Sequence, residues 1–201
     1  MAPAPKVAPA ALGFRVKSGW AMSVLLAGPA SGPELLLCQS ILLSDPAQPA
    51  SKQPYHVALE LSEREAAPIV RKLCRVVGAA AKQSVAELLE QAAKRNRAVQ
   101  AAALVVGSVA DPESLHNDHM RAHGREGQLF RAVLEDALRE ADIVCEVLVE
   151  KTAYASAASR LRKTLEAAKR VVAALGESHD GSWRAEEKLA ALAAWVSLAK
   201  P

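Results

Sequence analysis

The chain has 201 residues, of which 51% are hydrophobic and 23% are charged. This apolar content can offset the entropy of ordering the chain, which excludes an intrinsically disordered body. The formal net charge of +3 is far from that of a dedicated nucleic-acid binder, and no apolar run approaches the roughly 20 residues of a membrane span. We therefore expect a folded protein with no membrane partner.

Residues 1–11 are rich in alanine and proline and lack the apolar segment of a secretion signal. We expect a disordered tail there and a cytoplasmic location. The three cysteines, Cys38, Cys74 and Cys145, are an odd number at wide spacing, each within an apolar stretch. That pattern predicts buried thiols rather than disulfides or a zinc site.

Three extended segments are predicted in the first third of the chain. Residues Gly13–Ala27 and Glu34–Leu43 are apolar runs, and the glycines and prolines of Gly28–Pro33 predict a turn between them. A segment with three prolines follows, and the alternation of apolar residues over Tyr55–Leu61 then predicts a third strand.

Helices and strands alternate in the rest of the chain. A capping box at Ser62–Glu65 predicts the start of a helix that reaches about Asn96. The continuous apolar run Val99–Gly107 is typical of a strand buried on both faces of a parallel sheet. The remaining predicted elements are a helix from Asp111 to about Arg139, a strand over Ile143–Val149, and helices over Thr152–Leu175 and Ser182–Leu198.

This order of elements predicts an α/β fold with a mixed five-stranded sheet, in which crossover helices place the last two strands parallel to the first. We expect one domain over residues 12–176, followed by a loop and a C-terminal helix over residues 177–201. That helix carries an apolar stripe that must be buried, either on its own domain or on a second copy in a homodimer. The stripe consists of Leu189, Leu192, Trp195, Val196 and Ala199.

The element order resembles that of the ribonuclease H-like superfamily, whose sheet order is 3-2-1-4-5, over roughly residues 12 to 175. Resolvase-type members begin with a strand of the form Leu-Gly-Ile-Asp, a short stretch containing glycine, and then Gly-x-Ala. Here the chain reads Leu-Gly-Phe-Arg-Val-Lys-Ser-Gly-Trp-Ala over residues 12–21. The resemblance implies the sheet order 3-2-1-4-5 flanked by helices.

The same alignment shows a departure from the family. Arg15 stands where resolvase-type members carry their first metal-binding carboxylate, and no acidic residue occurs from Met1 to Gly32. Hydrolysis with two metal ions needs clustered carboxylates to hold the ions about 4 Å apart, and a cation among them would repel those ions. The usual nuclease mechanism is therefore not expected.

The strongest functional signal lies after the strand Val99–Gly107, where three of the five histidines occur within eight residues. Ligands bind outside the carboxyl ends of parallel strands in open sheets, and this segment follows such an end. On a helix, His116, His119 and His123 would share one face, which continues the core-facing stripe.

Three interpretations of this cluster remain open. The first is a divalent metal site formed by His116, His119 and His123, with oxygen ligands from Asp111 or Asp118. The second is an anion site at the helix N-terminus. The basic residues expected at that anion site are Arg15, Lys17, Arg121 and Arg125. The third is that the histidines pack and form hydrogen bonds at the helix start or at a subunit contact.

Two function classes follow from these observations. The first is a non-hydrolytic ribonuclease H-like binding or scaffold domain that contacts nucleic acid or another protein. The second is a metal-dependent nuclease or phosphoryl-transfer enzyme with a rearranged site, whose candidate catalytic residues are Asp111, Asp118, His119 and His123. A divalent metal is the only cofactor indicated, because the chain lacks the glycine-rich loops that bind nucleotides.

Overall fold

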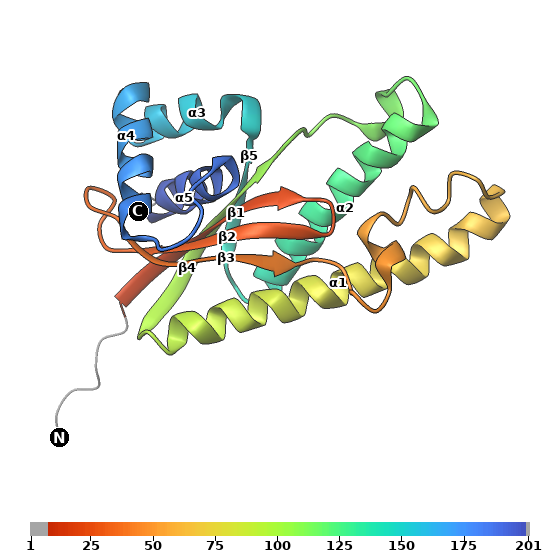
Figure 1. Ribbon diagram of the computed structural model, residues 1–201, viewed down its shortest axis with the longest axis horizontal. Coiled ribbons are helices and arrows are strands. Elements are labelled where there is room, and N and C mark those ends of the chain that lie inside the picture. Colours follow the sequence, from red (N-terminus) through yellow and green to blue (C-terminus); the bar gives the residue numbers. More distant parts are fainter. Residues whose placement is uncertain (1–7, 200–201) are drawn as a thin grey trace.

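The computed structural model describes residues 8–199, which form a five-stranded mixed sheet with helices on both faces (Figure 1). The strand order is β3-β2-β1-β4-β5, which confirms the predicted order. β2 pairs antiparallel with both β1 and β3, whereas β4 pairs parallel with both β1 and β5. The strands are β1 (Ala8–Lys17), β2 (Trp20–Ala27), β3 (Glu34–Leu42), β4 (Arg97–Val106) and β5 (Val144–Val149).

The prediction of one strand over Gly13–Ala27 is wrong, because this run contains the second half of β1 and all of β2. The chain reverses at Ser18-Gly19, where Gly19 has a φ of 81° that favours glycine. Apolar residues continue on both sides of this turn, so their pattern does not reveal it. The predicted tail is also wrong over residues 8–11, which pair with β4 as part of β1; residues 1–7 lie outside the described residues.

The strand predicted over Tyr55–Leu61 is also wrong, because this segment forms successive turns. Backbone N–H groups donate to the carbonyl three residues earlier, as from Ala58 to Tyr55 and from Leu59 to His56. The apolar residues Val57, Leu59 and Leu61 remain 38% to 42% exposed. Their alternation therefore does not reflect a buried sheet face.

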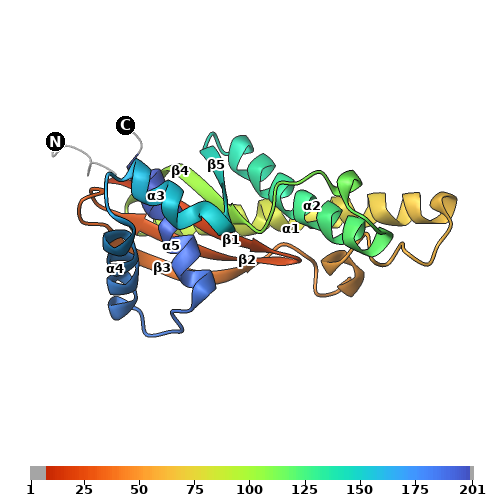
Figure 2. The ribbon, with the colours of Figure 1, turned by 90° about the horizontal axis from the view of Figure 1, so that it is seen from above.

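Five α-helices surround the sheet, with α1 and α2 on one face and α3, α4 and α5 on the other (Figure 2). The helix predicted over Thr152–Leu175 is divided, because Arg162 adopts a φ of 51° and the hydroxyl of Thr164 caps a new helix. The helix predicted from Asp111 begins instead at Asp118, after a short 3-10 turn. The helices are α1 (Glu63–Ala93), α2 (Asp118–Glu140), α3 (Ala153–Arg160), α4 (Leu165–Leu175) and α5 (Ala185–Leu198).

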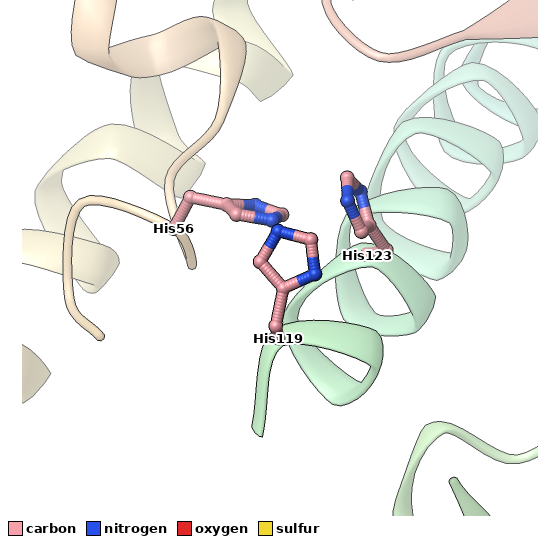
Figure 3. A group of neighbouring side chains, drawn as sticks. All are labelled: His56, His119 and His123. Carbon is pink, nitrogen blue, oxygen red and sulfur yellow. The ribbon is translucent and has the colours of Figure 1, made fainter. Parts of the chain in front are cut away.

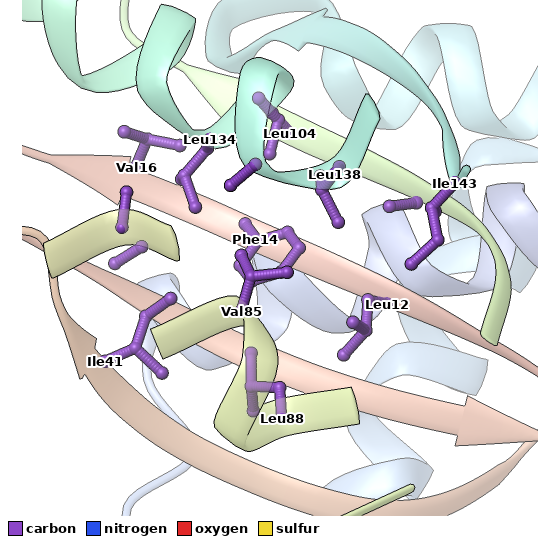
Figure 4. Close-up of a cluster of buried hydrophobic side chains, with 14 of the residues drawn as sticks. Leu12, Phe14, Val16, Ile41, Val85, Leu88, Leu104, Leu134, Leu138 and Ile143 are labelled. Carbon is purple, nitrogen blue, oxygen red and sulfur yellow. The ribbon is translucent and has the colours of Figure 1, made fainter. Parts of the chain in front are cut away.

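Two hydrophobic cores lie on opposite sides of the sheet. Figure 4 shows the core between the sheet and helices α1 and α2, where Phe14 of β1 lies close to Val85 of α1 and Leu138 of α2. In the described residues, no helix is long and apolar enough to cross a membrane. Cys38, Cys74 and Cys145 are half-buried thiols.

The second core is dominated by α5, which packs against β1, β2 and β4. Trp195 is fully buried, and its indole N–H donates to the carbonyl of Ala30 at 2.7 Å. Ala199 is exposed, whereas the other residues of the predicted stripe are buried on the chain's own sheet. The helix therefore belongs to the same core as the strands, and the stripe is not available to a second copy.

We predict that Gly13→Ala strongly destabilises the fold. A Cβ atom at this position would lie 2.0 Å from the backbone oxygen of Ala190 and 2.2 Å from the backbone nitrogen of Ala194. Helix α5 would have to move off the sheet, and we expect the free energy of unfolding to fall by about 3 kcal/mol. Urea denaturation measures this loss.

Gly78→Ala is the matched control, because no atom lies within 4 Å of the added Cβ in the middle of α1. Alanine favours the helix over glycine, so the free energy of unfolding should rise by up to about 1 kcal/mol. Equal effects from the two substitutions would show that α5 does not pack closely on β1.

Candidate functional site

The carboxyl ends of β1, β4 and β5 meet at one edge of the sheet, because these strands are parallel neighbours. Arg15 lies near this edge on β1 and is only 4% exposed. Its guanidinium donates to the backbone oxygens of Val16 at 2.8 Å and of Val105 at 3.4 Å, and it forms an ion pair with Glu150 directly after β5. Residues from all three strand ends therefore hold this side chain.

Other carboxylates on the α3 and α5 side of the sheet are also paired with basic residues. Lys17 lies 3.4 Å from Glu186 at the start of α5, and Glu146 of β5 pairs with Arg160 of α3. Together with the pair between Arg15 and Glu150, these contacts neutralise carboxylates on this face within the protein itself. Within residues 8–199, these carboxylates do not form a group that could share a metal ion.

Three histidines converge elsewhere, next to the first turns of α2 (Figure 3). His119 and His123 are one helical turn apart on α2, and His56 reaches them from the turns that follow η1 (Pro49–Lys52). Their ring centroids are 4.2 to 5.0 Å apart. One nitrogen from each ring lies within 4.8 Å of the corresponding nitrogens of the other two rings. Within residues 8–199, these three side chains are the group found close enough together to share a metal ion.

A buried carboxylate orients one of these rings. Glu126 of α2 is fully buried, and its Oε1 atom accepts a hydrogen bond from Nδ1 of His56 at 2.8 Å and a second from the backbone N–H of His56 at 3.3 Å. Because a carboxylate can only accept, Nδ1 carries a proton. Nε2 is then the nitrogen of His56 with a lone pair available.

Within residues 8–199, Nε2 of His56 and Oε2 of Glu126 are both buried and have no hydrogen-bond partner. Oε2 lies 4.0 Å from Nδ1 of His123. Burial, reinforced by the neighbouring His56 and His119, lowers the pKa of His123 from its ordinary value, and Glu126 opposes this shift.

The structure brings together only two of the three histidines predicted to share a metal. His116 is exposed in a bend before α2 begins, so the helical spacing that relates His119 to His123 does not extend to it. His56 takes the third position instead. Sequence reasoning missed His56 because it lies in the segment predicted to be a strand, and no local spacing links it to α2.

The two aspartates predicted as candidate catalytic residues lie outside the histidine group and contact other residues. Asp111 caps the 3-10 turn η2 (Pro112–Ser114) by accepting from the backbone N–H of Glu113, and Asp118 pairs with Arg121. Neither belongs to the group of three histidines. Arg125 pairs with Glu113 at 2.8 Å.

The four basic residues predicted to form an anion site lie in two different cavities. Arg121 and Arg125 line a groove of about 600 Å³ between the first turns of α1 and α2. Arg15 and Lys17 line a separate cavity of about 460 Å³, which also touches His123. The predicted anion site is therefore not assembled as a single group.

Comparisons with known proteins agree with this architecture. The sequence matches no protein-family model and no curated protein. Among solved structures, Thermus thermophilus RuvC is similar, with a TM-score of 0.54 and 12% identity over 93% of this chain and 92% of that chain. T. thermophilus RuvC in complex with a Holliday junction substrate has a TM-score of 0.52 and 10% identity over 93% of this chain and 90% of that chain. At these identities the likeness establishes the fold: the chain has a ribonuclease H-like fold and resembles the RuvC-type resolvases in architecture.

Proposed function

We propose that the protein is a ribonuclease H-like domain that binds nucleic acid and does not hydrolyse it at the sheet edge. The observation that carries this proposal is the position of Arg15. The side chain lies where resolvase-type members carry a metal-binding carboxylate, and it is buried in an ion pair with Glu150.

The ion pairs on the α3 and α5 side of the sheet argue against hydrolysis with two metal ions. Two divalent ions about 4 Å apart need several carboxylates directed at them. Here the nearest carboxylates already balance a guanidinium and an ammonium group. An incoming ion would have to displace Arg15, whose buried charge would then lose its partners at a cost of several kcal/mol.

A basic stripe on α1 supports nucleic acid as the partner. Arg64, Arg71, Arg75 and Lys82 are spaced by seven, four and seven residues, which places them on one face of the helix. All four are exposed, and within residues 8–199 none of the three arginines has a carboxylate within ion-pairing distance; Lys82 pairs with Glu140. The stripe is about 27 Å long.

The position of this stripe suits a long ligand. The N-terminal part of α1 extends past the ends of the strands, so the stripe lies on a projecting part of the molecule (Figure 1). Arginine forms paired hydrogen bonds to phosphate oxygens, and a row of such groups matches a nucleic-acid backbone. The similar RuvC structure contains a Holliday junction substrate, which supports branched DNA as the first ligand to test.

We predict that the purified protein does not cleave branched, hybrid or single-stranded substrates in the presence of magnesium or manganese. The charge pairs on the sheet face leave no set of carboxylates that could hold these ions. Denaturing gel electrophoresis of labelled substrates measures cleavage. Metal-dependent cleavage by the wild-type protein would contradict this proposal.

We predict that the double substitution Arg71→Gln and Arg75→Gln weakens binding of branched DNA by about tenfold. Because each phosphate contact contributes about 0.9 to the slope of log K against log salt, the slope should become shallower by up to about 2. Gel-shift titrations at several salt concentrations measure both quantities.

The control for this prediction removes two charges from the opposite side of the sheet. Lys169→Gln with Arg170→Gln changes two exposed basic residues of α4 and leaves α1 intact. Binding by this variant should match the wild type. Equal losses in the two variants, or a loss only in the α4 variant, would contradict the assignment of binding to α1.

The histidine group favours a second candidate function, a metal-dependent nuclease or phosphoryl-transfer enzyme with a rearranged site. The predicted participants His119 and His123 would act with His56 and Glu126 in place of Asp111 and Asp118. This candidate requires cleavage that chelation stops and that His119→Gln abolishes. Repeating the cleavage experiment with zinc and cobalt, the ions that imidazole ligands suit, separates the two functions.

A further inference from the structure

We propose that His56, His119 and His123 bind one divalent transition-metal ion of the zinc class, with Glu126 positioning His56 for this role. The site is independent of the binding role proposed for α1, because none of its four residues belongs to the basic stripe or to the paired carboxylates of the sheet face. It is the metal site that the second candidate function would use. The bound ion would also join the turn segment Tyr55–Leu61 to α2.

The geometry of the three rings fits a single ion after small side-chain rotations. In tetrahedral coordination with zinc to nitrogen distances of about 2.0 to 2.1 Å, neighbouring nitrogen ligands are about 3.4 Å apart. The ligand atoms here lie within 4.8 Å of one another. His119 and His123 are exposed on adjacent turns of α2. Their side chains can therefore rotate and bring the ring nitrogens to the shorter spacing without movement of the backbone.

The contacts of Glu126 are those of a residue that supports a metal ligand. Metal-binding histidines donate their second ring nitrogen to a carboxylate or carbonyl, which fixes the tautomer and the ring orientation. Here Nδ1 of His56 donates to Glu126, and the backbone N–H of His56 donates to the same oxygen. Both the side chain and the backbone of His56 are therefore held in place.

The unsatisfied atoms provide an independent observation. Nε2 of His56 is buried and, within residues 8–199, has no hydrogen-bond partner. Leaving a buried polar atom without a partner destabilises the fold, and each such group requires an explanation. A metal ion bound to Nε2 accounts for this atom, and the proton on Nδ1 leaves Nε2 as the nitrogen able to bind it.

The donor set selects the class of metal. Three neutral imidazoles suit zinc, cobalt, nickel and copper, whereas magnesium and calcium prefer oxygen ligands. Three protein ligands leave a fourth coordination position for water, which is the arrangement of zinc sites that act on substrates rather than closed structural sites. Since His119 and His123 are exposed, we place this fourth position on the solvent side.

The first test measures zinc binding to the full chain without an affinity tag, because a polyhistidine tag binds the same ions. After chelator treatment and dialysis, competition with a chromophoric chelator and native mass spectrometry should show one tightly bound zinc ion per chain. His56→Gln, His119→Gln and His123→Gln should each weaken binding by at least 100-fold. Glu126→Gln should weaken it by 10-fold to 100-fold, the range for partners of metal ligands.

His116→Gln is the matched control, because this exposed histidine lies just before α2 but outside the group of three. It should bind zinc as the wild type does. Circular dichroism of every variant in the metal-free state confirms that each is folded. The absence of zinc binding by the wild type, or retention of one ion at wild-type affinity in His119→Gln or His123→Gln, would overturn the proposal.

A second measurement tests the coordination directly. Cobalt added to the metal-free wild type should give the intense visible absorption of a four-coordinate or five-coordinate ion with nitrogen ligands. The spectrum should be lost in His119→Gln and unchanged in His116→Gln. A weak six-coordinate spectrum in the wild type would contradict a site made of three imidazoles and one solvent ligand.

Discussion

The close approach of α5 to the centre of the sheet determines the form of this molecule. A glycine in β1 and small residues in α5 allow the two backbones to pack without intervening side chains at Gly13. Because this contact fills the centre of one face, polar groups are displaced to the ends of β1, β4 and β5. The buried arginine and its partners occupy this remaining space.

The two polar clusters balance charge in different ways. At the sheet edge, positive and negative side chains neutralise each other, and the buried guanidinium makes further hydrogen bonds to backbone oxygens. Beside α2, one buried carboxylate binds His56 and lies 4.0 Å from His123, and the His119 ring packs against both of these rings. Within residues 8–199, each cluster keeps buried polar atoms without a hydrogen-bond partner, Nε of Arg15 in the first and Nε2 of His56 and Oε2 of Glu126 in the second. Only the second cluster combines such an atom with three imidazoles that could share an ion.

The predicted strand order agrees with the structure although the strands predicted over Gly13–Ala27 and Tyr55–Leu61 are wrong, because the division missed at Gly19 and the false strand at Tyr55 offset each other. Local patterns identify other elements correctly. Continuous apolar residues identify β4, the capping box identifies the start of α1, and the glycine and proline residues at 28–33 identify the turn between β2 and β3. The turn at Gly19 and the division at Arg162 are missed because each depends on the backbone conformation of one residue within an otherwise continuous pattern. The segment at Tyr55 shows that apolar alternation alone does not establish a strand.

The candidate site, like the fold, could be predicted only in part from the sequence. His119 and His123 are one helical turn apart, so their common face follows from the sequence alone. His116 is misassigned because Asn117 caps the helix, and the regular spacing begins only after this residue. His56 cannot be connected to α2 without the fold, because 70 residues separate it from Glu126 and the contact depends on how the turns pack against α2.

The packing of α5 on β1 also constrains how the chain folds during synthesis. The residues that cover Gly13, Ala190 and Ala194, are added roughly 180 positions after it. Until then, the central strands expose the apolar face that α5 will bury, and such exposed surface promotes aggregation. A ribosome that stalls before α5 has emerged would therefore hold a sheet covered on one side only, with the second core still open to solvent.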